Sequence, residues 1–447
     1  MNHFSTLKQD SFKQNKHFFS WMPRPKRLLA IAVTCAFFGG MPVANAQEKV
    51  PDPVRHFLNA LLKKWKMKVN AEKVQRTAEG YELYNITFSK NKESKETPIK
   101  KKYFISGAFI ARATLKGVSQ SNGFTKYEHI KMEQVLYHIK RSDGETVMIS
   151  APREDKYNVS ILHSDSAKSP LEKRIAGAML TEKSITPRID ILWSNGFSLV
   201  AHDVRQAWKG NRRTGEGNSE ASLGGLAISA RDLALLDPAF SVWMEMLGLE
   251  KTKLSGVLRS QNQWQSDQRL HINTLMQLTI EKAGTLELEL NDLAFPTTFM
   301  NLFENQKVSG NETTTSQSTS SLSLKNPQIS SALNQLSLQR VRIKWKDAGL
   351  TRRYLELQKS GAFKDLQIPG TNGTQNVRSL DEILRNILGE PYQRASDAFQ
   401  KDPKNIQIEI RGRNGAPISA PMLLALALAP QALASMLQID VRANMPE

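Results

Sequence analysis

The chain has 447 residues, of which 61 are basic and 43 acidic, giving a formal net charge of +18 at pH 7. This length allows two or three ordinary domains or one elongated domain. The only cysteine, Cys35, lies in an N-terminal segment that we expect to be removed, which excludes disulfides and thiolate metal sites from the mature chain.

Residues 1–46 show the three parts of a cleaved secretory signal peptide. A positive flank at 24–27 precedes an apolar run from Leu28 to Phe38, and Ala44-Asn45-Ala46 provides the small residues that signal peptidase recognises. The run is shorter than the roughly 20 residues of a helical membrane span. We therefore expect cleavage between Ala46 and Gln47 and a periplasmic or secreted protein, whether translation starts at Met1 or at Met22.

Positive charge is concentrated near the start of the mature chain. Loss of residues 1–46 would lower the formal charge to +13, and residues 47–150, with 20 basic and 11 acidic residues, hold most of it. Outside the cytoplasm such a region favours anionic lipid headgroups or acidic envelope polymers over nucleic acid. A soluble surface that happens to be rich in lysine is the alternative.

The segment PDPVRHFLNALLKKWKMKV predicts a basic amphipathic helix. Asp52 is placed to cap it, and Pro53 suits its first turn. Apolar residues then recur at helical spacing, with basic residues mostly on the other side. Two interpretations stay open. Either the apolar stripe docks on a sheet, or the helix lies on an anionic membrane surface, with the candidate contact residues Arg55, Lys63, Lys64, Trp65 and Lys66.

The next part of the chain predicts strands joined by short turns. From residue 80 to 152, short alternating runs separated by turn residues predict an antiparallel meander. PLEKRIAGAMLTEKS, after Ser169, predicts a helix. RIDILW and FSLVAHDV predict a hairpin that turns at Ser194-Asn195-Gly196.

Three later segments share an alternating strand, an aspartate and a helix-like stretch. They are GLAISARDLALLDPAFSVWMEMLG, TLELELNDLAFPTTFMNLFEN and RVRIKWKDAGLTRRYLELQKSG, with Asp232, Asp292 and Asp347 at the shared position. We interpret each aspartate as a turn or cap residue, because a short acceptor side chain at a strand end can bond local N–H groups. Between the first two segments, long paired strands should turn at Lys282-Ala283-Gly284.

Together these elements predict an α+β fold, an extended curved antiparallel β-sheet with helices packed on one face and repeated strand-turn-helix units. Ten of the fifteen residues from 309 to 323 are Ser or Thr, which predicts a mobile loop. The expected parts are the signal peptide, 1–46; the basic N-terminal helix plus antiparallel meander, 47–165; a strand-helix repeat region, 166–304; the Ser/Thr-rich mobile loop, 305–328; and a C-terminal strand-helix region, 329–447.

The sequence contains no recognisable motif for a metal, a cofactor or a catalytic group. The eight histidines lack metal-ligand spacing, and GEGNSEASLGG fails the dinucleotide-binding pattern. Pro421 and Pro430 interrupt PMLLALALAPQALASMLQIDV, which we interpret as a buried helix before a last strand, Leu437 to Val441. We therefore expect no enzymatic activity, no cofactor, no metal and no membrane span in the mature chain.

The runs YELYNITF, ISARDLALL, LELELNDLAF and IKWKDAGL repeat one cadence, in which alternating apolar residues are followed by a short polar residue and a further apolar one. This cadence resembles the repeats of AsmA-like bacterial envelope proteins. The resemblance implies a periplasmic, sheet-rich protein associated with lipid or outer-layer homeostasis. Those relatives usually keep an N-terminal membrane anchor, whereas the signal of this chain is of the cleavable kind.

Our leading hypothesis from the sequence is an exported, non-enzymatic periplasmic envelope protein that binds lipid or another amphipathic ligand. Two alternatives stay open. The protein could be a soluble periplasmic scaffold that binds envelope proteins, or a hydrolase whose site is not recognisable from sequence.

Export should remove residues 1–46, because the apolar run is short and the small residues before Gln47 fit signal peptidase. Mass spectrometry of the exported protein should find Gln47 at its N-terminus. A membrane-bound form that keeps Leu28 to Phe38 would contradict this prediction.

Overall fold

The computed structural model describes residues 50–65, 68–89, 103–141, 144–235, 238–265, 269–296, 335–361, 380–419, 422 and 436–446. The expected signal peptide with its cleavage site at Ala46 and Gln47, the expected mobile loop 305–328 and Lys66 lie outside the described residues. So does most of the apolar segment that precedes the last strand.

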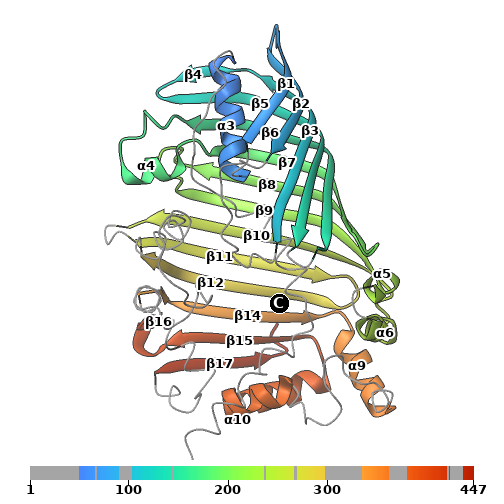
Figure 1. Ribbon diagram of the computed structural model, residues 1–447. Helices are drawn as coiled ribbons and strands as arrows, with labels where there is room; N and C mark the ends of the chain where they lie inside the picture. The colour runs from blue at the N-terminus through green and yellow to red at the C-terminus, as the bar shows by residue number, and fades with distance from the viewer. Residues whose placement is uncertain are drawn as a thin grey trace, which may run out of the picture.

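The described strands form one sheet of 17 strands (Figure 1). In chain order they are β1 (Lys68–Thr77), β2 (Gly80–Ser89), β3 (Tyr103–Lys116), β4 (Ser119–Ser121), β5 (Phe124–Arg141), β6 (Thr146–Leu162), β7 (Met179–Trp193), β8 (Ser198–Gly210), β9 (Gly217–Ser229), β10 (Lys251–Trp264), β11 (Arg269–Ile280), β12 (Gly284–Pro296), β13 (Ser337–Leu338), β14 (Arg340–Asp347), β15 (Asn405–Gly412), β16 (Ile418–Ser419) and β17 (Leu437–Ala443).

The described helices are few. They are α3 (Asp52–Trp65), α4 (Pro170–Ile175), α5 (Ala230–Ala234), α6 (Pro238–Met246), α9 (Leu350–Lys359), α10 (Leu380–Lys401) and the 3₁₀ turn η2 (Arg413–Gly415).

Strand neighbours largely follow chain order, and all pairings are antiparallel. The long strands run from β1 through β2, β3, β5 and β6 to β12, then through β14 and β15 to β17. The sheet is open and curved (Figure 1). This confirms the predicted antiparallel sheet and the expected turn at Lys282-Ala283-Gly284, which joins β11 to β12.

The helix expected after Ser169 is shorter than predicted. Ser169 and Glu172 form a capping box at its start, but α4 ends at Ile175 and β7 begins at Met179. The left-handed backbone of Gly177 (φ 74°) lets the chain turn away from the helix, and pairing with β6 then decides the conformation of the residues that follow. Because β6 and β7 pair, the sheet is continuous across the expected boundary at residue 165.

α3 packs against one face of the sheet. Val54 and Phe57 are fully buried and Leu61 is nearly so, in a core cluster shared with residues of β2, β3, β5 and β6. The Tyr127 hydroxyl donates to the carbonyl of Pro53 at 2.5 Å. We call the face that contacts α3 the inner face and the opposite one the outer face. The side chains of Lys63, Lys64 and Trp65 lie outside the described residues, so a contact of these residues with a membrane surface stays a prediction.

Several long strands contain a non-glycine residue with left-handed backbone, which is uncommon. These residues are Asn85 (φ 50°), Gln134 (φ 51°), Asn158 (φ 51°), Asp203 (φ 52°) and Asp292 (φ 55°). Leu83 and Ile86, on either side of Asn85, are both buried in the core cluster although they are three residues apart. In a regular strand, residues three apart point to opposite faces. The left-handed residue therefore returns the apolar side chains to the inner face.

A line of interrupted pairing crosses the sheet through three of these residues, Asn85, Gln134 and Asp203. The ladder skips the pairs Asn85 with Ala111, Ala111 with Gln134, and Gln134 with Pro152. The interruption continues between β6 and β7, then skips Pro187 with Asp203 and Asp203 with Gly224. Proline lacks an N–H group, so it fits a strand where the ladder is already broken. We call this line the crease: Asn85, Ala111, Gln134, Pro152, Pro187, Asp203 and Gly224.

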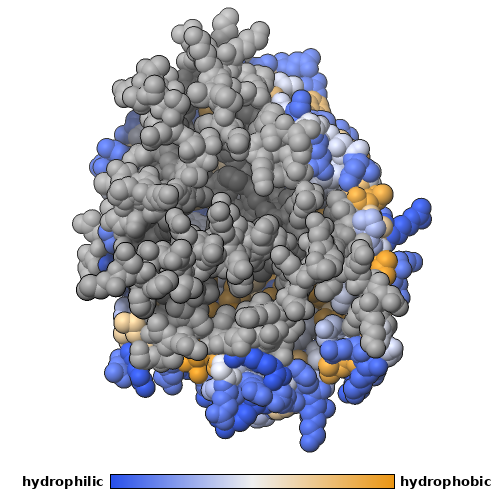
Figure 2. All heavy atoms as spheres, turned by 60° about the horizontal axis from the view of Figure 1, so that its bottom comes forward, coloured by the Kyte–Doolittle hydropathy of each residue, from blue (hydrophilic) through white to orange (hydrophobic). Residues whose placement is uncertain are grey.

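Hydrophilic side chains dominate the described surface at the C-terminal end of the molecule. Figure 2 brings this end forward and shows α10 as a largely blue, hydrophilic surface with smaller groups of orange, hydrophobic residues at its margins.

The left-handed position in β2 should reject a β-branched residue. Asn85→Val should lower the free energy of unfolding by about 1–2 kcal/mol, because the left-handed backbone crowds its Cβ, whereas Asn85→Gly should be close to neutral. Thr87→Val, an exposed position of the same strand with ordinary backbone, is the control. Urea unfolding monitored by circular dichroism would measure the difference, and equal stability of the Val and Gly variants would contradict the assignment.

Candidate functional site

An apolar surface lines the inner face from β10 to β17. One register row crosses six strands and contains Leu258, Met276, Leu288, Ile343, Ile408 and Val441. On β12, β14 and β15 the rows on either side are also apolar, with Leu286, Trp345 and Ile406 on one side and Leu290, Val341 and Ile410 on the other. We call these three rows the apolar ladder. Its side chains are half-buried for the most part, and Ile343 near its centre is 38% exposed.

Charged side chains of the same strands alternate onto the outer face. Arg340 contacts Glu289 at 2.6 Å, and Lys346 contacts Glu287 at 3.3 Å. These residues are interleaved with the apolar ladder along β12 and β14, so each strand presents carbon to one side and charge to the other. The sequence of β14, RVRIKWKD, shows this alternation of basic and apolar residues.

Helices border the apolar ladder. Tyr392 and Ala395 of α10 pack with Val441 of β17 in one small cluster. A second cluster contains Leu233 of α5 and Met244 of α6, and Trp345 of the ladder packs against it. Figure 1 shows α10 at one end of the sheet and α5 and α6 at a lateral margin.

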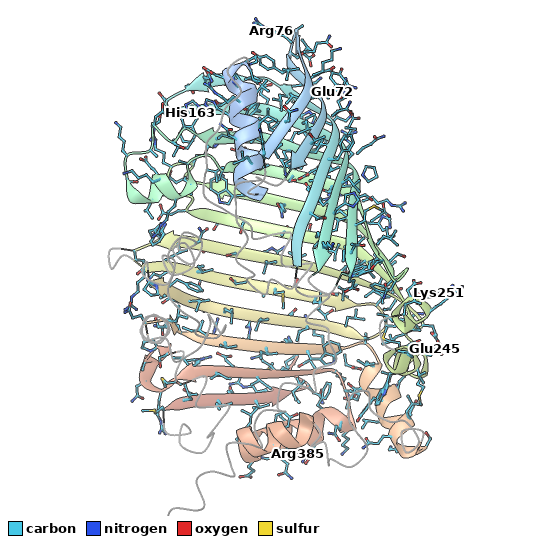
Figure 3. All side chains as sticks on the ribbon, viewed as in Figure 1. Glu72, Arg76, His163, Glu245, Lys251 and Arg385 are labelled. Atoms are coloured by element: carbon cyan, nitrogen blue, oxygen red, sulfur yellow. The ribbon has the colours of Figure 1, made fainter. Side chains whose placement is uncertain are left out.

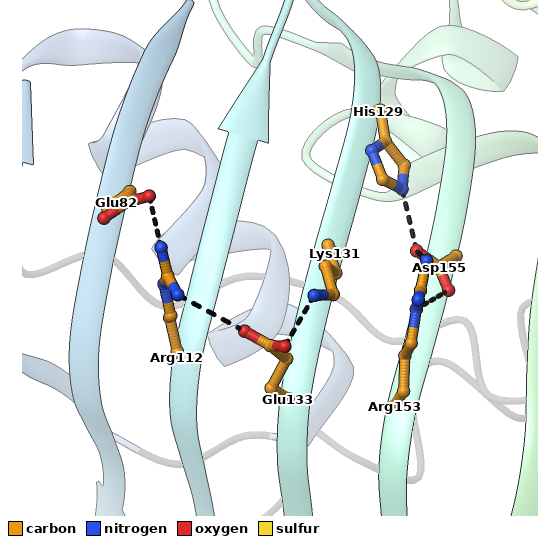
Figure 4. Close-up of polar contacts among 7 residues, drawn as sticks. All are labelled: Glu82, Arg112, His129, Lys131, Glu133, Arg153 and Asp155. Atoms are coloured by element: carbon orange, nitrogen blue, oxygen red, sulfur yellow. Dashed lines mark hydrogen bonds and ion pairs between the residues drawn. The ribbon is translucent and has the colours of Figure 1, made fainter. Parts of the chain in front are cut away.

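The outer face of β2, β3, β5 and β6 holds a network of ion pairs (Figure 4). The Arg112 guanidinium contacts Glu82 at 2.5 Å and Glu133 at 3.8 Å. Hydrogen bonds from Tyr84 and then Arg112 lower the pKa of Glu82 from its ordinary value. The network therefore favours the charged form of Glu82, and Arg112 joins carboxylates of neighbouring strands.

Asp155 forms the second part of this network. His129 Nε2 contacts Asp155 Oδ1 at 2.8 Å, and Arg153 Nε donates to Asp155 Oδ2 at 2.5 Å (Figure 4). Burial alone would raise the pKa of Asp155, but the hydrogen bonds from Arg153 and His129 outweigh it and lower that pKa. Asp155 is thus held as a carboxylate between two nitrogen donors.

Two histidines share one buried threonine where α3 meets the sheet. His56 Nδ1 lies 2.7 Å and His163 Nε2 lies 2.8 Å from Thr125 Oγ1, and the two ring centroids are 4.1 Å apart. Thr125 is fully buried, and Figure 3 shows His163 beside α3. The pKa of His56 is lowered by burial, then by His163 and Arg55, against the opposite effect of nearby Asp52 and Asp165. Protonation of both rings would place two positive charges in contact.

The three aspartates of the repeated cadence have different local roles. Asp347 accepts from the N–H groups of Gly349 at 2.7 Å and Thr351 at 3.0 Å, at the start of α9. Asp232 is the third residue of α5, and Ser229 is the N-cap that accepts its N–H at 3.1 Å.

Asp292 neither ends its strand nor precedes a described helix, which differs from the expectation. β12 continues to Pro296, and Asp292 forms a left-handed bulge where the register with β11 shifts. Its N–H donates to Asn273 Oδ1 at 2.8 Å, and its carboxylate contacts His271 at 2.5 Å. The short acceptor side chain serves a mid-strand reversal here, because the apolar residues Leu290 and Leu293 on either side must share one face.

The remaining candidate residue, Arg55, forms an ion pair with Asp52 in the first turn of α3.

Within the described ranges, no group of three or more His, Cys, Asp or Glu side chains could hold a metal ion. None of the described helices combines the length and the hydrophobicity of a membrane span.

A family model described as an uncharacterized protein matches residues 277–444. This span begins near the end of β11 and contains all of β12 to β17, and so covers most of the apolar ladder. A search of curated proteins finds no match to the chain.

The contact between α3 and the sheet should weaken in acid. The fold lowers the pKa of His56, so below about pH 6.5 the unfolded chain binds more protons at this residue than the folded chain does. The stabilisation from the neutral ring is therefore present above that pH and is lost as the pH falls. Urea unfolding at pH 7 and pH 5 should show a smaller loss of stability for His56→Gln than for the wild type. His202→Gln, at an exposed position of β8, should keep the wild-type loss, and equal losses in all three proteins would contradict the prediction.

Proposed function

We propose that the protein is an exported periplasmic protein of the cell envelope that binds lipid or another amphipathic ligand on the inner face of its sheet, without catalysing a reaction. The observation that supports this most is the apolar ladder. Its central row places an apolar side chain on each of six consecutive paired strands. Monomeric soluble proteins rarely leave such a contiguous apolar surface without a use.

Burial of hydrocarbon against this surface would supply the binding energy. Each buried methylene group contributes about 0.8 kcal/mol. The six strands from β10 to β17 occupy five interstrand spacings, about 24 Å at 4.8 Å each. This length suits an extended long acyl chain lying across the strands.

The placement of charge and helices supports the same proposal. α3 and α10 contact opposite ends of the register row that includes Ile130 and Val441, so we propose that the helices share the inner face and close the two ends of the ligand surface. The basic N-terminal region, with Arg55, Lys63, Lys64, Trp65 and Lys66, would meet anionic headgroups or an acidic envelope polymer. A scaffold that binds envelope proteins remains the competing proposal.

The ligand surface can be tested with two identical substitutions on neighbouring residues. Ile343→Asn places an amide in the centre of the apolar ladder, and Lys344→Asn makes the same change on the outer face of β14. Titration with a neutral acyl-chain fluorophore should show at least tenfold weaker binding for Ile343→Asn, about 1.4 kcal/mol, and wild-type affinity for Lys344→Asn. Because Ile343 is 38% exposed, both variants should unfold at nearly wild-type urea concentration.

Lipid extraction of the purified mature protein should also release a stoichiometric amphiphile. A wild-type protein that neither yields lipid nor binds the fluorophore would refute the proposal and favour the scaffold.

A further inference from the structure

The strand β17 has an open edge. In the described part of the chain its one strand partner is β15. The N–H of Asn444 donates to the carbonyl of Asn405 at 2.7 Å, which fixes where the hydrogen-bonded pairs of this ladder fall. In an antiparallel ladder such pairs alternate with pairs whose N–H and C=O groups point away from each other. The backbone groups of Val441 and Ala443 therefore point away from β15, toward the open edge.

A groove of about 550 Å³ lies between α10 and this edge. One wall is the side of the helix that carries Pro391, Arg394, Ala395 and Ala398, and the other wall is formed by residues 441–446. Figure 1 shows α10 alongside β17 at the end of the sheet. The volume is within the range of protein pockets that hold ligands, about 300–1,000 Å³. The outward-pointing backbone groups of the strand thus belong to a groove that has a helix as its second wall.

Contacts between the helix and the strand hold the two walls in place. Tyr392 and Ala395 of α10 pack with Val441 of β17. Just after the strand, the side-chain amide of Asn444 donates to the carbonyl of Ala398 at 3.0 Å. The groove is therefore formed before any partner binds, which reduces the ordering cost of binding.

The charged side chains that line the groove are both basic. They are Arg394 of α10 and Arg442 of β17, and no acidic side chain is among the described lining residues. Arg394 pairs with Glu390 at 3.6 Å, and Arg442 pairs with Asp440. The two arginine side chains are 74% and 62% exposed, and exposed pairs contribute little energy, so a carboxylate of a ligand can replace either partner. The charge of the groove therefore favours an acidic occupant.

We propose that this groove binds an extended acidic segment of a partner protein, which adds a strand to the edge of β17. Alternate residues of the added strand would exchange hydrogen bonds with the backbone of Val441 and Ala443. Carboxylates of the segment would meet Arg394 and Arg442. A hydrocarbon chain or a helix would leave the N–H and C=O groups of the edge without partners, whereas an extended backbone pairs them. The site uses the backbone edge of the sheet and is independent of lipid binding on the apolar ladder.

The test measures binding of fluorescent peptides of about six residues, the length of the strand wall, to the mature full-length protein by anisotropy. A peptide of alternating valine and glutamate should bind at least tenfold more tightly than one of alternating valine and lysine. N-methylation of either all valines or all glutamates tests strand addition without any change to the protein. One methylated peptide should lose at least tenfold in affinity and the other should stay within threefold of the parent, because one set of N–H groups faces β17.

Charge removal tests the two arginines. Arg394→Gln and Arg442→Gln should each weaken binding of the acidic peptide at least threefold. Arg411→Gln is the matched control, because Arg411 pairs with Glu409 at the same two-residue spacing on the neighbouring strand but does not line the groove. This variant should keep the wild-type affinity.

A bulky side chain in the groove should block the peptide. Ala398→Trp, at an exposed position of the helix wall, should lower the affinity at least tenfold. Gln393→Trp, at an exposed position of α10 that does not line the groove, should keep it. Because both positions are exposed, both variants should unfold at nearly wild-type urea concentration.

Three results would overturn the proposal. They are a wild-type protein that binds none of the peptides, equal affinity for the acidic and basic peptides, and equal losses for the two methylated peptides. A wild-type dimer in sedimentation velocity that Ala398→Trp dissociates would place a second copy of the chain in the groove and would also overturn the acidic partner segment.

Discussion

The strict alternation of side chains along a β-strand is the constraint on which this structure depends. Long strands such as β5 and β6 must keep apolar side chains on one face while the sheet curves and its pairing changes. A left-handed residue solves this problem locally, because it lets Leu83 and Ile86 share a face that a regular strand would deny one of them. Gln134 in β5 and Asp203 in β8 repeat this solution along the crease, so the core under α3 and the second core beside α5 belong to one continuous inner face.

The same alternation separates the electrostatics of the protein from its apolar surface. Outer-face charges of both signs lie on adjacent strands and pair across them, as Arg112 does with Glu82 and Arg340 with Glu289. Partly exposed pairs of this kind contribute little stability individually. Their main consequence is that the outer face is well hydrated. The apolar side chains of β10 to β17 are gathered on the inner face.

The sequence predicts the elements whose signals are local. The helix from Asp52, the turn at Lys282-Ala283-Gly284 and the last strand at Leu437 all have short-range patterns, and the structure contains each of them. The strand that begins at Met179 could not be predicted in this way, because pairing with β6 outweighs the helical pattern of its first residues. The cadence of LELELNDLAF is visible in sequence, but a capping aspartate and a bulge aspartate look alike until the register with β11 is known.

Glu154 and Lys156 of β6 form an ion pair on the inner face, opposite Met132 and Ile130, and the sequence does not predict this placement. In PREDKYN, residues 152 to 158, charged side chains alternate over both faces, and the sequence does not reveal which set is inside. Interruptions of the pairing with β5 at Pro152 and Asn158 determine which side chains of this segment point inward. They direct Arg153 and Asp155 outward to His129, and Glu154 and Lys156 inward. Without these interruptions, regular alternation from Ala151 to Val159, which are both in the core, would direct Arg153 and Asp155 inward instead. The reversals that keep the core apolar therefore also select the two charges that face the inner surface.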